Sequence, residues 1–147
     1  MNYEIVDLKQ KILVGVSAVT GNNDPKMGEI ISRLWAQLYQ NGIHAGIKNK
    51  TNGKAIGLYS DYQGDTYRVT VGYDVTQAEN TKLTTKIIPA GKYAKFSVHG
   101  DMHQAVAEAW GKIRDMDLER SYTGDFEEYL NADIQQADID IYIALKG

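Results

Sequence analysis

The chain has 147 residues and a mass of 16.4 kDa, a length typical of one domain or of two small halves that share a core. Hydrophobic residues make up 43% and charged residues 24%, an ordinary soluble composition that excludes a wholly disordered chain. The sequence has no apolar stretch of the roughly 20 residues that a membrane span needs. The absence of cysteine excludes disulfides, thiol catalysis and cysteine-ligated zinc. Since the first residues lack the pattern of a signal peptide, we expect a cytoplasmic protein.

The net charge of −3 is unevenly distributed along the chain. Residues 115–147 hold 2 basic and 9 acidic side chains, whereas residues 1–114 hold 14 basic and 10 acidic ones. Proteins that bind nucleic acid through its backbone need clustered lysine and arginine, and this sequence has no such cluster. We therefore expect no direct contact with nucleic acid. The acidic segment could attract a cationic partner, or it could be a solvated surface.

The first half of the chain predicts a strand followed by a helix. Residues 11–18 alternate apolar and polar side chains, which is typical of a half-buried strand. Asp24-Pro25 has the pattern of a helix N-cap followed by proline, and apolar residues then recur at helical spacing until Asn41-Gly42 closes the segment. Residues 43–54 are polar and rich in glycine, so we expect a loop there. Two strands follow, at 55–60 and 67–75, and the short connector between them predicts an antiparallel pair.

The second half predicts the same order of elements. Asp101 with Gln104 three residues later has the pattern of a capping box, and the helix that it starts is expected to run to about Met116. Strands are predicted at 92–98, 126–130 and 138–145. The chain therefore contains a βαββ pattern twice, in half-repeats of about 1–78 and 85–147 of one domain. We expect an α+β fold, with both helices on one side of an antiparallel sheet.

The face of the sheet opposite the helices is predicted to carry a ligand cleft. If the helices cover the aliphatic side of every strand, the other face combines aromatic, glycine and acidic residues: Gly57, Tyr59, Thr70, Gly72, Glu127, Tyr129, Asp140 and Tyr142. Glycine within a strand often marks a close approach, and tyrosine commonly lines pockets. Tyr62 is expected near the same cavity. The alternative is that these are ordinary half-buried strand residues.

Glu127 is the candidate with the clearest chemistry. A carboxyl group among aromatic rings would either form an ion pair or have its pKa raised. When ionised it would attract a cation, with cation–π attraction from the rings, and when protonated it could act as a general acid. Asp140 is the other carboxylate that could assist it. The spacing of His99 and His103 resembles that of metal ligands, but Gly100 lies between them and no third ligand is indicated, so we expect neither a metal nor a cofactor.

Five segments follow one another along the chain in this order: AIGLYSDY, GDTYRVTVGYDV, IIPAGKYAKFSVHG, FEEYL and DIDIYIAL. In this ordered set the chain resembles the GyrI-like effector-binding family. It implies a tandem βαββ repeat with pseudo-twofold symmetry. It also implies a cleft between the repeats, lined by aromatic residues around a glutamate in a Phe-Glu-x-Tyr-like strand, which would be Glu127. Trp35, Tyr59 and Trp110 match positions where the family places aromatic residues.

The family also implies a function. Such domains sense small molecules in multidrug transcription regulators of the AraC and MerR types, and they occur alone as integron-associated proteins. Their ligands tend to be lipophilic cations. Because this sequence has no room for a helix-turn-helix, we expect a standalone binding module for such a ligand. Two alternatives remain: a hydrolase of reactive cyclopropane-type compounds that uses Glu127, or a protein-interaction module that docks on DNA gyrase or on a separate DNA-binding protein.

Overall fold

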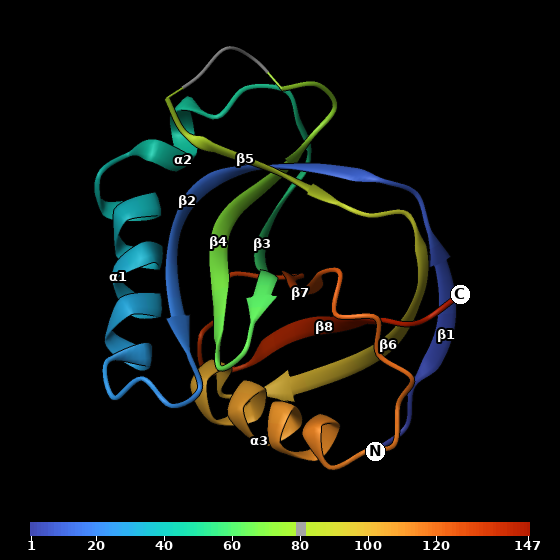
Figure 1. The fold of residues 1–147 in the computed structure, drawn as a ribbon. Coiled ribbons are helices and arrows are strands. Elements are labelled where there is room, and N and C mark those ends of the chain that lie inside the picture. Colours follow the sequence, from blue (N-terminus) through green and yellow to red (C-terminus); the bar gives the residue numbers. More distant parts are fainter. Residues whose placement is uncertain (79–81) are drawn as a thin grey trace.

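A curled antiparallel sheet with helices against its outer side forms the fold of the computed structural model, which describes residues 1–78 and 82–147 (Figure 1). The strands are β1 (Glu4–Leu8), β2 (Lys11–Gly21), β3 (Lys50–Gln63), β4 (Thr66–Val75), β5 (Thr84–Ile88), β6 (Gly91–Gly100), β7 (Asp125–Tyr129) and β8 (Ala137–Ala144). The helices are α1 (Met27–Gln40), α2 (Ile43–Gly46) and α3 (Met102–Arg114). None of the helices in the described residues is long and apolar enough to cross a membrane.

The order of the strands reveals two βαββ units that share one sheet. The order is β1-β6-β8-β7-β3-β4-β2-β5, so β2-α1-β3-β4 and β6-α3-β7-β8 meet where β3 pairs with β7. This confirms the predicted α+β class and the tandem repeat. The remaining two strands are exchanged, because β1 pairs with β6 of the second unit and β5 pairs with β2 of the first. Both lie at a sheet edge, where one side is unpaired and the apolar alternation that would predict a strand is weak.

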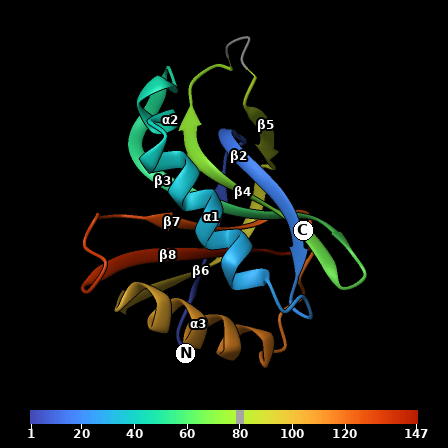
Figure 2. The same cartoon turned by 90° about the vertical axis from the view of Figure 1, so that its left-hand side faces the viewer.

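Both faces of the sheet are buried. On the helix face, Val69 and Val71 of β4 pack in one cluster with Leu34 of α1. Ile141 of β8 packs in a second cluster with Ile113 of α3. Figure 2 shows both helices in front of the strands on this side. The inner face is enclosed by the curl of the sheet and holds a separate cluster: Leu13, Ile56, Leu58, Ile88, Tyr93, Phe126, Tyr142 and Ala144.

The expectation of a cleft on the face away from the helices is wrong. Gly57 and Glu127 pair in register between Val71 and Ile141, which lie under the helices, so both positions are on the helix face. The prediction assumed that the aliphatic residues of every strand share one face. Because the sheet is curled and buries both faces, β3 turns Ile56 inward whereas β8 turns Ile141 toward the helices.

Local predictions differ in their outcome. The side chain of Asp101 accepts a hydrogen bond from the Gln104 backbone N–H at 3.0 Å, which confirms the predicted start of α3. Helix α1 begins only at Met27, and the Asp24 carboxylate accepts from the Lys26 N–H in the preceding turn instead of capping the helix. The loop predicted at 43–54 is wrong, since α2 and the first residues of β3 occupy most of it.

Candidate functional site

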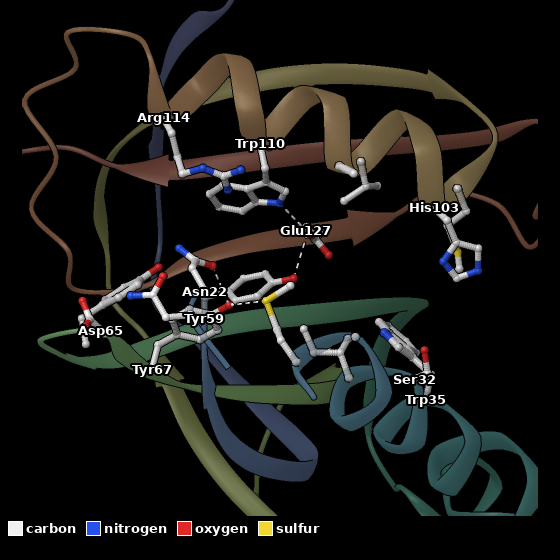
Figure 3. A pocket seen from close by; sticks show the side chains of 18 of the residues that line it. Asn22, Ser32, Trp35, Tyr59, Asp65, Tyr67, His103, Trp110, Arg114 and Glu127 are labelled. Carbon is white, nitrogen blue, oxygen red and sulfur yellow. Dashed lines mark hydrogen bonds between the residues drawn. The ribbon is translucent and has the colours of Figure 1, made fainter. Parts of the chain in front are cut away.

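A pocket of about 710 Å³ lies between α1 and α3, above the central strands β3 and β7. Figure 3 shows Glu127 in the middle of it, with Trp110 on one side and Tyr59 on another. The helices contribute an apolar lining of Met27, Ile31, Trp35, Met102, Val106 and Trp110, and the strands contribute Tyr59, Tyr67, Glu127 and Tyr129. The pocket therefore combines aromatic walls with one deep carboxyl group.

Glu127 is held by three neutral donors. Its Oε2 accepts hydrogen bonds from the Trp110 indole N–H at 2.6 Å and from the Tyr59 hydroxyl at 3.2 Å, while its Oε1 accepts from the Tyr129 hydroxyl at 2.7 Å. The residue is only 2% exposed. Within residues 1–78 and 82–147, no basic side chain forms an ion pair with it. The negative charge at the floor of the pocket is thus solvated by hydrogen bonds but not neutralised.

Burial sets the protonation of this cluster. It raises the pKa of Glu127 above its ordinary value of 4.5, and the three hydrogen bonds oppose the rise by favouring the carboxylate. Burial, followed by the nearby charge of Glu127, also raises the pKa values of Tyr59 and Tyr129 well above 10.0. Both tyrosines therefore keep their protons and act as donors to the carboxylate over the whole physiological range.

The aromatic frame follows the pseudo-twofold symmetry of the fold. In the pairing of β3 with β7, Gly57 lies opposite Glu127 and the axis passes between them, so it relates Tyr59 to Tyr129. Trp35 and Trp110 occupy matching places on the two helices. Each tryptophan meets the tyrosine of the other repeat edge to face: the ring centroids of Trp35 and Tyr129 are 5.1 Å apart, and those of Tyr59 and Trp110 are 5.4 Å apart. Two symmetric aromatic pairs thus surround a single glutamate.

Gly57 stands where a second glutamate would be by symmetry. A Cβ built on Gly57 would lie 3.4 Å from Glu127 Oε1 and 3.5 Å from Trp35 Cζ2. Both contacts are of ordinary van der Waals length, so the space above Gly57 is already filled by these two side chains. Any residue larger than alanine would displace one of them. The glycine therefore allows Trp35 and Glu127 to meet over β3.

Three of the predicted residues, Tyr142, Gly72 and Asp140, lie away from the pocket. Tyr142 belongs to the inner face, where its ring stacks on Phe126 with centroids 4.5 Å apart. Gly72 also faces inward, and a Cβ there would collide with the Val14 carbonyl oxygen, so this glycine serves the close pairing of β4 with β2. Both predictions are wrong for the same reason as the predicted cleft. They assumed that the aliphatic residues of every strand lie on the helix face, whereas β4 and β8 place Gly72 and Tyr142 on the inner face. Asp140 fails in the same way, since it pairs with Glu128 on the inner side.

The remaining predicted positions come together. Trp35, Tyr59, Trp110, Glu127 and Tyr129 line the pocket, and Gly57 supports its floor. Their part in ligand binding stays a prediction. Tyr62 also reaches the lining, where its hydroxyl donates to the buried Asp125 at 2.6 Å.

Sequence reasoning missed the basic end of the pocket. Arg114 and Arg120 both line it, and Arg120 donates to Asp125 at 2.7 Å. Helical spacing could have found Arg114, which follows Trp110 by four residues and so lies on the same side of α3. No local pattern could have found Arg120, since it lies outside the regular elements, apart from an isolated bridge to Leu145.

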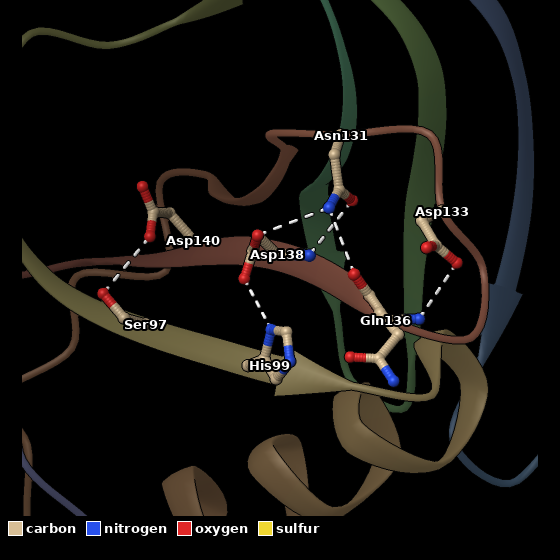
Figure 4. Close-up of polar contacts among 7 residues, drawn as sticks. All are labelled: Ser97, His99, Asn131, Asp133, Gln136, Asp138 and Asp140. Atoms are coloured by element: carbon tan, nitrogen blue, oxygen red, sulfur yellow. Dashed lines mark hydrogen bonds and ion pairs between the residues drawn. The ribbon is translucent and has the colours of Figure 1, made fainter.

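The two histidines of the metal-like spacing do not act together. His99 Nδ1 lies 2.6 Å from Asp138, which raises the pKa of His99 (Figure 4). His103 lines the pocket instead. Among the described residues, no group of three or more histidine, aspartate and glutamate side chains is arranged to hold a metal ion.

Comparisons with known proteins agree with this architecture. The family model described as integron-associated effector binding protein matches residues 4–145. An integron cassette protein from the mobile metagenome of Vibrio cholerae is 26% identical, with 98% of this chain and 95% of that chain covered and a TM-score of 0.78. No match was found among curated proteins.

Two further solved structures share the fold at lower identity. A putative transcription regulation protein from Staphylococcus aureus is 22% identical, with 100% of this chain and 99% of that chain covered and a TM-score of 0.80. The protein SAV2435, solved with tetraphenylphosphonium bound, is 18% identical, with 100% and 95% covered and a TM-score of 0.85.

Proposed function

The chain belongs to the family of integron-associated effector-binding proteins, and from that premise we propose that its pocket binds a lipophilic organic cation with Glu127 as the counter-charge. The observation that carries the proposal is a carboxyl group, 2% exposed, that is bound by three neutral donors and has no basic partner among the described residues. An ionised carboxylate buried in this way is costly unless an opposite charge joins it. A cationic ligand would supply that charge.

The walls of the pocket support the same class of ligand. The rings of Trp35, Tyr59, Trp110 and Tyr129 surround the carboxyl group, and aromatic faces attract a cation in addition to burying its apolar groups. The volume of about 710 Å³ is in the range of pockets that enclose drug-sized molecules. The tetraphenylphosphonium bound to SAV2435 is a lipophilic cation, which is the class proposed here.

The proposal is tested by isothermal titration of tetraphenylphosphonium into the wild type and Glu127→Gln, with neutral triphenylphosphine oxide as the comparison ligand. Glutamine can take the place of the carboxylate, because its oxygen can accept from Trp110 and Tyr59 while its amide donates to Tyr129, whose hydroxyl then accepts. The substitution thus removes the charge and keeps the contacts. Two unit charges roughly 5 Å apart at an effective dielectric constant of about 20 attract by about 3 kcal/mol, which corresponds to a loss of affinity of about 100-fold.

Glu128→Gln is the matched control. It removes the same charge from the next residue of β7, whose side chain lies on the other face of the sheet. We expect this variant to bind the cation like the wild type, and we expect the weaker binding of the neutral compound to change by less than about threefold in either variant. Equal losses for the cation and the neutral compound in Glu127→Gln would contradict a charge role, and no binding of the cation to the wild type would contradict the proposal as a whole.

A further inference from the structure

The two ends of the pocket differ, although the repeats that form them are related by symmetry. Tyr39 follows Trp35 by four residues on α1, and Arg114 follows Trp110 by four residues on α3, so the two occupy equivalent positions. Tyr39 stacks on Trp35 with the planes 9° apart, and its hydroxyl accepts a hydrogen bond from Tyr73 at 3.1 Å. The equivalent position on α3 holds Arg114, a cation that lines the pocket.

The Arg114 side chain is exposed at this end of the pocket, and within the described part of the chain it forms neither a hydrogen bond nor an ion pair. Figure 3 shows it beyond Trp110 as seen from His103, on the side of Tyr67 and Asn22. Its charge acts on this end, because burial raises the pKa of Tyr67 and Arg114 opposes the rise. Arg114 and Tyr67 thus both line the end of the pocket that lies away from His103.

The two other charged residues that line this end, Arg120 and Asp65, form no ion pair with Arg114. Arg120 is paired with Asp125 at 2.7 Å, and that carboxylate is fully buried. Asp65 lies in the exposed turn between β3 and β4 and forms no ion pair in the described residues. Asn22 accepts from Tyr67 at 2.9 Å through its oxygen, which leaves its amide N–H groups to the pocket. The end is thus rich in donors, with one guanidinium free to bind an acceptor.

Among the described residues that line the opposite end, none is an arginine or a lysine. This end is formed by Trp35, Met102, Val106 and Tyr129, with the exposed His103 and Ser32 at its rim. A ligand whose positive centre lies beside Glu127, near the pseudo-twofold axis, would have no reason to choose one orientation in a fully symmetric pocket. Arg114 breaks that symmetry.

We propose that Arg114 is a specificity-determining residue that binds an anionic group, such as a carboxylate, on a ligand whose cationic centre lies at Glu127. The inference rests on the proposed function and refines it from a lipophilic cation to a zwitterion bound in one orientation. One helical turn, roughly 5 to 6 Å along α3, separates Trp110 from Arg114, which is within reach of a short alkyl chain. The planar guanidinium suits a carboxylate because it can donate two parallel hydrogen bonds.

The test compares (carboxybutyl)triphenylphosphonium with its methyl ester, which have the same cationic centre and differ in the negative charge and in one methyl group. Both are titrated by calorimetry at about pH 8, where the ligand carboxylate is ionised. In the wild type we expect the acid to bind about fivefold more tightly than the ester, the size of a partly solvated charge pair. In Arg114→Gln we expect this preference to be reversed, because Glu127 then repels the carboxylate without compensation.

Lys112→Gln is the matched control. Lys112 lies on the same helix, has the same charge and is exposed as Arg114 is, but it lies outside the pocket lining, so this variant should keep the preference for the acid. An ester that binds the wild type as tightly as the acid, or an unchanged preference in Arg114→Gln, would overturn the role of Arg114 while leaving the proposed function intact. Failure of both phosphonium compounds to bind the wild type would overturn the proposed function and this inference with it.

Discussion

Cation binding to the pocket should release a proton. Burial raises the pKa of Glu127, so at a pH below that raised value the free pocket holds a protonated carboxyl group. A cation favours the ionised form, and its binding must therefore expel the proton. We expect the Kd for tetraphenylphosphonium to increase as the pH is lowered through the raised pKa of Glu127.

The size of this effect follows from the number of carboxyl groups at the binding centre. Glu127 is the one carboxyl group in the described lining that is buried, since Asp65 lies in an exposed turn. One proton is therefore the limit, and the Kd should change by at most about tenfold per pH unit, which corresponds to about 1.4 kcal/mol.

Calorimetry at one pH in two buffers of different ionisation enthalpy measures the released protons directly. In phosphate and in Tris, the apparent enthalpies of binding should differ in the wild type and coincide in Glu127→Gln, which has no proton to release. If the wild type releases no proton at any pH between about 5 and 8, or if Glu127→Gln releases as many, the raised pKa of Glu127 is not linked to binding.

The raised pKa of Glu127 also makes the free energy of unfolding of the ligand-free protein depend on pH. Because the folded-state pKa lies above the ordinary value of 4.5, the native state binds more protons than the unfolded state in the interval between them. The stability that this proton contributes is fully present at a pH below the ordinary pKa of 4.5. It is lost as the pH rises through the raised pKa of the folded state. The free energy of unfolding of the wild type should thus fall relative to Glu127→Gln as the pH increases, which urea titrations at several pH values would measure.

Two further predictions concern the framework of the site. Gly57→Ala should bind tetraphenylphosphonium within about threefold of the wild type, because the added methyl group makes only ordinary contacts, whereas Gly57→Leu should bind at least about tenfold more weakly because it displaces Trp35 or Glu127. Equal affinities of the two variants in a binding titration would contradict this. Asp125→Asn should lower the free energy of unfolding by about 3 kcal/mol, because it leaves the largely buried Arg120 without its counter-charge. A loss below about 1 kcal/mol in urea unfolding would mean that Arg120 finds another partner or reaches water.

Patterns of short range were predictable from the sequence. The start of α3 follows from Asp101 and Gln104, because a capping interaction spans only three residues. The antiparallel pairing of β3 with β4 follows from their short connector. Glu127 and Tyr129 share a face because side chains alternate along every strand, whatever surrounds it.

Contacts between distant segments were not predictable in this way. The exchange of β1 and β5 between the repeats depends on pairing with strands far away in the chain, and an edge strand, being half exposed, leaves little local pattern. The ion pair between Arg120 and Asp125 spans only five residues, but no pattern predicts it, because Arg120 lies outside the regular elements.

The sequence by itself therefore determined the order of the elements within each βαββ unit, the repeat, and a set of aromatic residues that could surround Glu127. Only the tertiary structure decided which face of the sheet holds the pocket, and with it the exclusion of Gly72 and Tyr142. The physical reason is that alternation fixes the orientation of each residue relative to its neighbours but not relative to the helices. This sheet curls and buries both faces, so an aliphatic side chain can be buried on either one. Packing between the two repeats therefore decides which residues of a strand face the helices.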